Sequence, residues 1–257
     1  MLLTISPAKT LDFENSPKPQ DYSIPSFINN ADYLSKKLQN YSPSKLKELL
    51  KISDALTDLN FERIQNWELP LSKETAKQAL HVFKGEVYKG IDVDTLNKSS
   101  IEYLNSNLLI LSGLYGVLRP NDLMLPYRLE MGSKFRVTEK NKNLYKYWGD
   151  KLAEHFNKRL QEQNTDVLIN LASNEYFKAV NTNKLQANII TPEFKDEKNG
   201  SYKMIGFFAK KARGLMVRFI AENNITNPEE IKAFNKERYY FNNSLSNEKK
   251  WVFTRDH

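Results

Sequence analysis

The sequence has no cysteine among its 257 residues. This absence excludes a disulfide framework, a thiol nucleophile, an iron–sulfur cluster and any cysteine-based zinc site. Histidine is scarce too, with only His81, His155 and His257. None of them ends a Glu-x-x-His iron motif, because the residues three positions earlier are Gln78, Leu152 and Thr254. We expect no metal centre and no direct iron binding, although an all-carboxylate site for a hard cation, which has no recognisable spacing here, stays open.

Long apolar runs are also missing. The longest, Leu108 to Leu111, is far below the ~20 residues of a membrane span. The first residues, Met1 to Ile5, are too few for a signal peptide and lack its basic lead-in. We therefore expect a soluble, cytoplasmic protein without a membrane partner.

The common cofactor and catalytic motifs are absent as well. None of the nine glycines is followed by Lys-Ser or Lys-Thr, so there is no phosphate loop, and no G-x-G-x-x-G dinucleotide fingerprint occurs. The H-E-x-x-H and G-x-S-x-G motifs of metalloproteases and serine hydrolases are missing too. We expect no cofactor, and these motifs assign no catalytic residue.

The composition is that of a folded domain. The chain is 40% hydrophobic and 12% aromatic, which suffices for a sizeable core, and it shows no linker or internal repeat. We predict one domain over residues 1–257. Strand and helix patterns are interspersed without a regular βαβ rhythm, which favours a mixed α+β fold with a central sheet surrounded by helices. A doubly wound α/β sheet is the alternative.

Local patterns predict the individual elements. Ser42-Pro43 is typical of a helix start, and Asn199-Gly200 of a tight hairpin turn. Helices are predicted over 27–38, 43–50, 72–83, 144–160 and 212–219, and strands over 2–6, 166–172, 189–195, 202–208, 239–241 and 251–253.

Basic residues dominate one segment of a chain whose net charge is +7. Between Lys198 and Ala221 there are six basic and no acidic residues. Helical spacing places Ala212, Leu215, Met216 and Phe219 on one face, with Lys210, Arg213, Gly214 and Arg218 away from it. A glycine on the outer side would let a backbone or a phosphate approach closely. The pattern fits a phosphate-binding stripe, and it equally fits an ordinary solvated helix face.

Four short segments could carry polar chemistry. Ser112–Gly116, with Arg119 just beyond, could turn backbone amides toward an anion or could be a packing turn. Ser6–Thr10 could place Lys9 at the carboxyl edge of the first strand. In Asn170–Lys178, Ser173 or Asn174 could cap a helix, or Glu175, Tyr176 and Lys178 could face a cleft. Arg128 and Glu130 could be a catalytic or a structural ion pair.

Together these segments resemble the bacterial YaaA family of peroxide-stress resistance proteins. The resemblance runs in family order over nearly the whole chain. The matching stretches are Ile5-Ser6-Pro7-Ala8-Lys9-Thr10-Leu11, Phe83-Lys84-Gly85-Glu86-Val87-Tyr88, Leu111-Ser112-Gly113-Leu114-Tyr115-Gly116-Val117-Leu118-Arg119-Pro120, Pro126-Tyr127-Arg128-Leu129-Glu130-Met131-Gly132, Asn170-Leu171-Ala172-Ser173-Asn174-Glu175-Tyr176-Phe177-Lys178 and Ala209-Lys210-Lys211-Ala212-Arg213-Gly214-Leu215-Met216.

The resemblance implies a cytosolic protein that protects cells from hydrogen peroxide and is associated with limiting free intracellular iron. It also implies a single mixed domain that binds DNA through a positively charged cleft and a helix-hairpin-helix element. That element could lie in Ser44–Trp67, with its turn at Leu56–Asn60, or at Gly113–Gly116. Asp58 in the first candidate would repel a phosphate, and Pro120 would shorten the helix after the second.

Two functions follow as hypotheses. The leading one is a protein that binds double-stranded or structured DNA with little sequence preference through phosphate contacts. Its predicted DNA-binding residues are Lys9, Lys84, Gly113, Gly116, Arg119, Arg128, Lys178, Lys210, Lys211, Arg213 and Arg218. The alternative is an enzyme acting on a nucleotide or nucleic acid, with Lys9, Arg128, Glu130, Ser173 and Glu175 around a pocket. A wide basic groove would favour the first, and a concave pocket enclosing a carboxylate with a perturbed pKa would favour the second.

Overall fold

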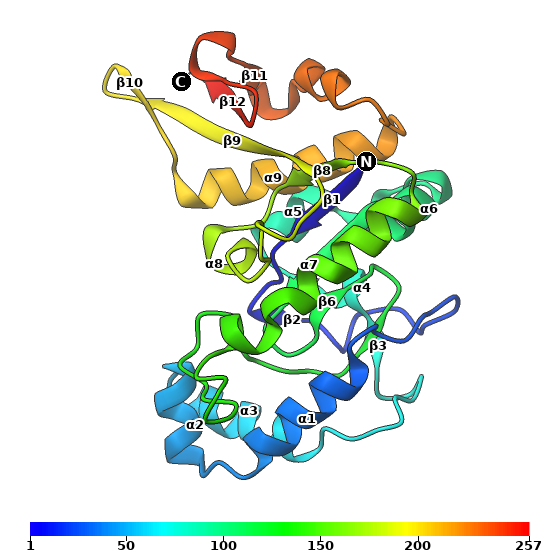
Figure 1. The fold of residues 1–257 in the computed structure, drawn as a ribbon, viewed down its shortest axis with the longest axis vertical. Helices are drawn as coiled ribbons and strands as arrows, with labels where there is room; N and C mark the ends of the chain where they lie inside the picture. Colours follow the sequence, from blue (N-terminus) through cyan, green and yellow to red (C-terminus); the bar gives the residue numbers. More distant parts are fainter. Residues whose placement is uncertain (257) are drawn as a thin grey trace.

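One mixed β-sheet forms the centre of the molecule in the computed structural model, which describes residues 1–256 (Figure 1). The sheet has eight strands in the order β11-β12-β9-β8-β1-β5-β6, and β10 pairs with β9. The strands are β1 (Leu2–Ile5), β5 (Leu108–Ser112), β6 (Gly116–Leu118), β8 (Val167–Asn170), β9 (Asn188–Lys198), β10 (Ser201–Lys203), β11 (Tyr240–Phe241) and β12 (Lys250–Arg255). His257 lies outside the described residues.

The middle of the sheet is parallel. Strands β5, β1, β8, β9 and β12 run in one direction, whereas β6, β10 and β11 pair in the antiparallel sense. All residues of β1 and β5 are buried, which agrees with their nearly continuous apolar sequences and with helices covering a parallel sheet. The parallel strands therefore present their carboxyl ends at one common edge.

Helices surround this sheet and extend the molecule beyond it. Figure 1 shows α1, α2 and α3 together at the lower end, with α7 crossing the middle and α9 beside the sheet in the upper half. The α-helices are α1 (Ile28–Gln39), α2 (Pro43–Leu50), α3 (Asp54–Gln65), α4 (Ala79–Val82), α5 (Glu86–Ile91), α6 (Lys98–Asn107), α7 (Leu144–Glu162), α8 (Asn174–Phe177) and α9 (Gly206–Glu222). The α+β prediction with a central sheet is confirmed; the parallel middle is a feature it did not specify.

Several local predictions are confirmed by the cap and turn geometry. The Ser42 side chain accepts a hydrogen bond from the Lys45 amide, and Pro43 opens α2. Asn199 and Gly200 both have positive φ, as a two-residue hairpin turn between β9 and β10 requires. The helix predicted over 144–160 corresponds to α7, which continues to Glu162 but is interrupted by a kink at Gly149, where φ is 39° and ψ is −122°. The expected terminal hairpin is the antiparallel pair β11 and β12.

The predicted helix over 72–83 is wrong. Ser72 starts only a single turn, in which its carbonyl accepts from the Ala76 amide. The chain then forms β3 (Lys77–Gln78), the four-residue α4 and β4 (Phe83–Lys84). Strand β3 pairs with β7 (Leu123–Met124), and β4 pairs with β2 (Thr10–Leu11). These pairings with distant segments outweigh the local helical pattern.

The predicted strand over 202–208 is also wrong beyond Lys203, because α9 already begins at Gly206. The buried face of α9 also differs from the predicted buried face. Gly214 is buried, not on the outer side, and the carbonyl of Val87 in α5 occupies the space where a side chain would begin. The close approach is thus that of a neighbouring backbone and not of a phosphate.

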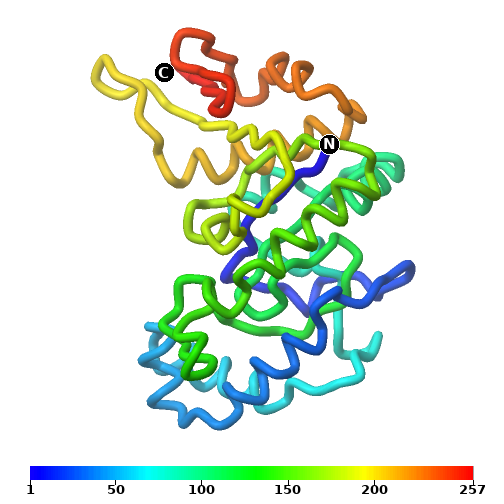
Figure 2. Tube along the Cα trace, viewed as in Figure 1, coloured from blue at the N-terminus to red at the C-terminus, as the bar shows by residue number. Residues whose placement is uncertain are grey.

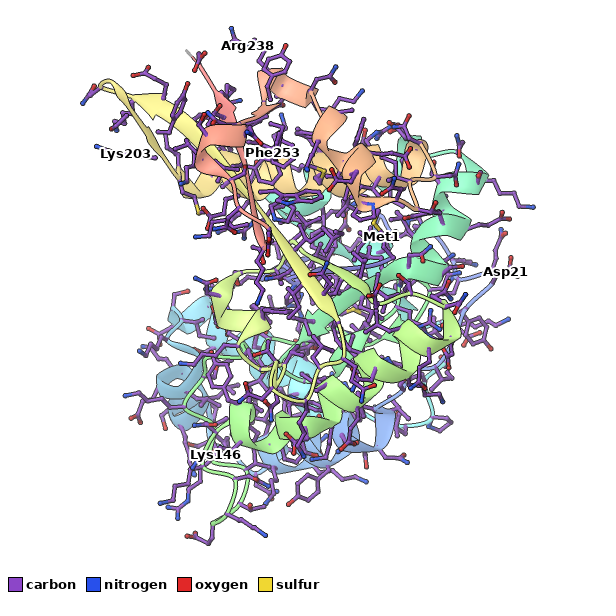
Figure 3. All side chains as sticks on the ribbon, turned by 45° about the horizontal axis from the view of Figure 1, so that its top comes forward. Met1, Asp21, Lys146, Lys203, Arg238 and Phe253 are labelled. Atoms are coloured by element: carbon purple, nitrogen blue, oxygen red, sulfur yellow. The ribbon has the colours of Figure 1, made fainter. Side chains whose placement is uncertain are left out.

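The ends of the chain and the hairpin mark the upper half of the molecule. Both termini lie there (Figure 2). Lys203 lies out on the β9–β10 hairpin, away from the packed interior (Figure 3). No helix among residues 1–256 combines the length and the apolar composition that a membrane crossing demands.

Candidate functional site

A cavity of about 570 Å³ lies at the carboxyl ends of β1 and β8. Ser6 to Thr10 follow β1, Ser173 to Tyr176 follow β8, and both segments line the cavity. In the sheet, β1 lies between β5 and β8. The chain passes from β1 to β5 on one side of β1, and the later strand β8 is added on the other side of β1. Such a reversal of strand order leaves a crevice between the loops of neighbouring parallel strands. The cavity occupies this crevice, and Figure 1 shows α5, α8 and α9 grouped around β1 and β8.

Four cationic side chains from three segments line the cavity: Lys9, Lys84, Lys210 and Arg213. The antiparallel pairing of Thr10 with Lys84 brings the segment after β1 next to β4. Lys210 and Arg213 are three residues apart on α9, so they lie on the same side of that helix. The fold therefore gathers onto one cavity four of the residues that the sequence predicted for DNA binding.

Three of these cations have no partner. The side chains of Lys84, Lys210 and Arg213 make no hydrogen bond or ion pair within residues 1–256, whereas Lys9 Nζ lies 3.5 Å from Glu130 Oε1. Burial lowers the pKa of the Arg213 guanidinium, an effect that Glu193 partly offsets. Arginine nevertheless stays protonated at neutral pH. A partly buried positive charge without a partner is costly, and an anion in the cavity would compensate it.

Glu130 is the most enclosed carboxylate of the cavity. Its Oε1 accepts from Arg128 Nε at 3.2 Å, and its Oε2 is buried without a hydrogen-bond partner in the described residues. Arg128 itself does not line the cavity, and it acts on the site through this ion pair. Two further carboxylates line the cavity: Glu175 accepts from the Gly132 amide at 3.0 Å, and Glu86 pairs with Lys89 at 2.7 Å. Glu130 thus keeps acceptor capacity that no described residue uses.

Hydroxyl groups complete the polar lining. Ser6 Oγ accepts from the Ser173 amide at 2.9 Å and lies 3.2 Å from Ser173 Oγ, and the Tyr88 hydroxyl donates to the Ser6 carbonyl at 3.1 Å. Burial, and then the neighbouring Tyr127 and Tyr176, raise the pKa of Tyr88 well above its usual value. Burial likewise raises the pKa of Tyr176. Both tyrosines are neutral at physiological pH and act as hydrogen-bonding groups.

Among residues 1–256 no histidine lines the cavity beside its serines. Neither of the described histidines, His81 and His155, is among its lining residues, so Ser173 has no histidine base beside it. His155 packs 5.4 Å from the Phe27 ring, and His81 lies beside Asp94. Among residues 1–256 no three His, Asp or Glu side chains gather to hold a metal ion.

Gly113 and Gly116 do not reach any surface. They are buried in the turn between β5 and β6, where the Leu129 carbonyl and the Trp148 ring occupy the space beside their Cα atoms. Trp148 Nε1 also donates to the Gly113 carbonyl at 3.0 Å. The packing interpretation applies to both glycines, and their predicted contact with DNA is wrong because DNA cannot reach them. The same strand-turn-strand geometry rules out a helix-hairpin-helix element here.

The other helix-hairpin-helix candidate, Ser44–Trp67, does contain two helices, α2 and α3, but its predicted turn is wrong. The segment Leu56–Asn60, expected to be the turn, lies inside α3. The actual turn between α2 and α3 is Lys51 to Ser53, with Lys51 in the left-handed conformation at φ 52°. This helix pair lies at the lower end of the molecule, apart from α9 (Figure 1).

The remaining predicted DNA-binding residues lie outside the cavity lining. Arg119 Nη2 pairs with the buried Asp122 at 2.9 Å, and Lys211 pairs with Glu237 at 2.5 Å. Arg218 contacts Glu222, Asp92 and Thr95, so it ties α9 to the end of α5. Lys178 is exposed, with its ammonium 5.7 Å from the Tyr145 ring centroid.

Tyr88 and Asn174 line the same cavity as Lys84, which local sequence patterns do not predict. Tyr88 and Lys84 stand in the same short motif, and Asn174 precedes Glu175, so proximity in the sequence was the available signal. The missing information was the strand order, which places β8 directly beside β1.

A family model and several known proteins are similar to nearly the whole length of this chain. The family model described as "Peroxide stress protein YaaA" matches residues 1–245. A "UPF0246 protein" of Neisseria gonorrhoeae (strain NCCP11945) is 50% identical over 256 residues, covering 99% of this chain and 98% of the relative. A "UPF0246 protein" of Hahella chejuensis is 49% identical over 257 residues and all of both chains. One from Aliivibrio fischeri (strain MJ11) is 47% identical over 256 residues, covering 100% of this chain and 98% of the relative.

Proposed function

Because the chain belongs to the peroxide stress protein YaaA family, which supports a role in peroxide stress, we propose that it acts in this response by binding DNA. The partner is double-stranded or structured DNA in the cytoplasm, contacted largely at its phosphates and with little sequence preference. The link to free intracellular iron is indirect, because a chain with no cysteine and three histidines has few ligands for iron.

The observation that carries this proposal is the set of unpaired cations at one cavity. Lys84, Lys210 and Arg213 come from two distant segments, and none of them forms a direct ion pair within residues 1–256. Glu193 acts on Arg213, and Asp12 on Lys84, only at longer range. Some surface lysines have such partners, for example Lys36 with Asp32, and many others within residues 1–256 have none. The feature specific to the cavity is that three unpaired cations from distant segments converge on it. Phosphates of a DNA backbone would supply the missing negative charges, and lysine and arginine contacts to phosphates provide sequence-independent affinity.

A binding measurement on two matched triple variants tests the proposal. Lys84→Gln, Lys210→Gln and Arg213→Gln together should weaken binding of a fluorescent paired duplex at low salt by at least about tenfold. The control replaces Lys36, Lys98 and Lys158, exposed cations of α1, α6 and α7, by Gln and removes the same charge. It should bind almost as the parent protein does. Equal losses in both variants, or no duplex binding by the parent, would contradict the proposal.

The enzyme alternative is favoured by one observation, the concave shape of the cavity around Glu130. Lys9, Glu130, Ser173 and Glu175 all line it, and Arg128 contacts Glu130. Turnover of a nucleotide or nucleic acid by the purified protein, lost in Glu130→Gln, would support this alternative. Binding without turnover would leave DNA binding as the function.

A further inference from the structure

The size of the cavity limits what can enter it. At about 570 Å³ it falls in the ~300–1,000 Å³ range of small-molecule pockets. A single nucleotide fits such a volume, whereas two paired strands do not. If DNA binds at this face, as proposed above, the duplex lies across the mouth and at most one nucleotide unit occupies the interior.

One side of the cavity suits a phosphate group. Arg213 and Lys210 point from neighbouring turns of α9, Lys84 comes from β4, and none of the three is paired within residues 1–256. The planar arginine can bind two phosphate oxygens at once, and the lysines add charge. Burial of Arg213 strengthens such an interaction, because water screens it less.

The remaining lining suits a nucleobase with an amino group. Pro7, Val87 and Leu171 provide apolar surface, and Tyr88 adds an aromatic ring. Glu130 contributes a carboxylate with unused acceptor capacity. Carboxylates accept hydrogen bonds from the exocyclic amino group of cytosine, and the amino groups of adenine and guanine offer the same donor. Thymine has a carbonyl oxygen in the corresponding position.

An exposed aromatic side chain, Phe207, lies about one helix turn from the cavity residue Lys210 without lining the cavity itself, and it points to DNA as the source of this nucleotide. Phe207 has 57% of its surface exposed although it is a large apolar residue. It lies three residues before Lys210 on α9, hence on the same side of the helix, and its ring packs edge-on against Phe208 at 5.7 Å. Apolar side chains in this position beside a nucleotide pocket can occupy the gap that an extruded base leaves in a duplex.

We propose that the cavity binds one unpaired nucleotide of a DNA strand, with its phosphate on Arg213 and Lys210 and the amino group of its base on Glu130. Phe207 then stacks where that base has left the helix. This proposal rests on the proposed DNA binding. It adds a preference for unpaired adenine, cytosine or guanine over unpaired thymine.

The test compares duplexes that differ at one position. The parent protein should bind a duplex with a single unpaired cytosine about tenfold more tightly than the fully paired duplex and more tightly than one with an unpaired thymine. This comparison needs no variant. Equal affinity for all three, together with salt-dependent binding, would overturn this inference and leave the proposed function standing. Absence of duplex binding altogether would overturn both.

Two variants locate the contacts. Glu130→Gln should abolish the preference for cytosine over thymine, because an amide can also donate to the thymine carbonyl; the readout is the ratio of the two affinities in the variant. Phe207→Ala replaces an exposed residue and should reduce the preference for unpaired over paired DNA. A cytosine preference that survives Glu130→Gln in folded protein would contradict the assignment of the base contact.

Free nucleotides separate the two sources of the ligand. Deoxycytidine monophosphate should compete with the bulged duplex only weakly and independently of Phe207, because it lacks the neighbouring stack. If deoxycytidine monophosphate binds as tightly as the bulged duplex and Phe207→Ala changes neither, the cavity serves a free nucleotide, and the DNA-strand proposal is wrong.

Discussion

At the scale of single residues, burial changes the pKa of several side chains. The clearest case among the histidines is His155. Burial, and then the nearby Arg159 and Arg119, lower the pKa of His155 from 6.5 to about 4. Its Nε2 is buried without a hydrogen-bond partner in residues 1–256, and its ring packs near Phe27. The folded protein therefore holds this imidazole neutral in a pH range where the unfolded chain would protonate it.

This difference predicts a loss of stability in mild acid. Because the folded pKa lies below the unfolded one, the stabilisation is complete above about pH 6.5 and is lost progressively as the pH falls toward 4. Between pH 7.5 and 5.5 the free energy of unfolding should fall by about 1 kcal/mol from this residue. Urea denaturation of the parent and of His155→Gln at both pH values measures this difference. The free energy of unfolding should fall less in the variant than in the parent. His81, whose pKa is also lowered by burial, leaves a residual dependence in both proteins.

At the scale of elements, α5 and α9 meet through glycines. A Cβ added at Gly214 would lie 1.8 Å from the Val87 carbonyl oxygen, and one at Gly90 would lie 2.3 Å from the Lys211 carbonyl oxygen. Any side chain there would push the two helices apart. The backbone contact fixes where α9 lies, and α9 carries Lys210 and Arg213 to the cavity.

Gly214→Ala should therefore destabilise the protein on the order of 3 kcal/mol or more, because a rigid backbone cannot yield to the new methyl group. Gly206→Ala in the same helix is the matched control. Nothing lies within 4 Å of its added Cβ, so its stability should equal or exceed that of the parent. Thermal denaturation of both variants measures the difference, and similar melting temperatures would show that the helix contact is looser than described.

The two arginines on α9 should respond in opposite ways. Arg218 donates to the Asp92 carbonyl at 3.1 Å and to Thr95 Oγ1 at 2.6 Å, whereas Arg213 has no such partner in residues 1–256. Arg218→Gln should cost about 1–3 kcal/mol of stability and leave DNA affinity unchanged. Arg213→Gln should leave stability unchanged or higher and weaken DNA binding. Denaturation and DNA titration of each variant decide this, and a reversed pattern would make Arg218 the phosphate contact.

Elements with strong local signals could be predicted from the sequence, and those made by distant pairing could not. Ser42-Pro43 and Asn199-Gly200 carry their own cap and turn chemistry, so α2 and the β9–β10 turn were predicted correctly. The 72–83 segment has a helical pattern, yet Lys77–Gln78 and Phe83–Lys84 pair with strands far away in the chain. The prediction that Gly214 lies on the outer side of its helix is wrong, because its burial depends on tertiary packing against α5, which the local sequence does not show.

At the scale of the whole molecule, strand order creates the candidate site. The segment Ser6–Thr10 was correctly predicted to lie at the carboxyl edge of a strand. Its convergence with Ser173–Tyr176, which begins 167 residues after Ser6, depends on β8 lying beside β1, which no local pattern shows. Hence the sequence could supply most of the residues of the site but not the cavity that joins them, nor the exclusion of Gly113 and Gly116.

Charge is also a property of the whole molecule, and salt dependence separates general attraction from contacts at the cavity. Each phosphate contact contributes roughly −0.9 to the slope of log affinity against log salt concentration. Replacing Lys84, Lys210 and Arg213 by Gln lowers the net charge from +7 to +4 and should make the slope shallower by about 2 to 3. The variant with Gln at Lys36, Lys98 and Lys158 has the same net charge, yet its slope should stay near that of the parent, because those residues do not line the cavity. Fluorescence anisotropy titrations at several salt concentrations give both slopes. An equal change in the two variants would mean that the duplex responds to overall charge and not to this cavity.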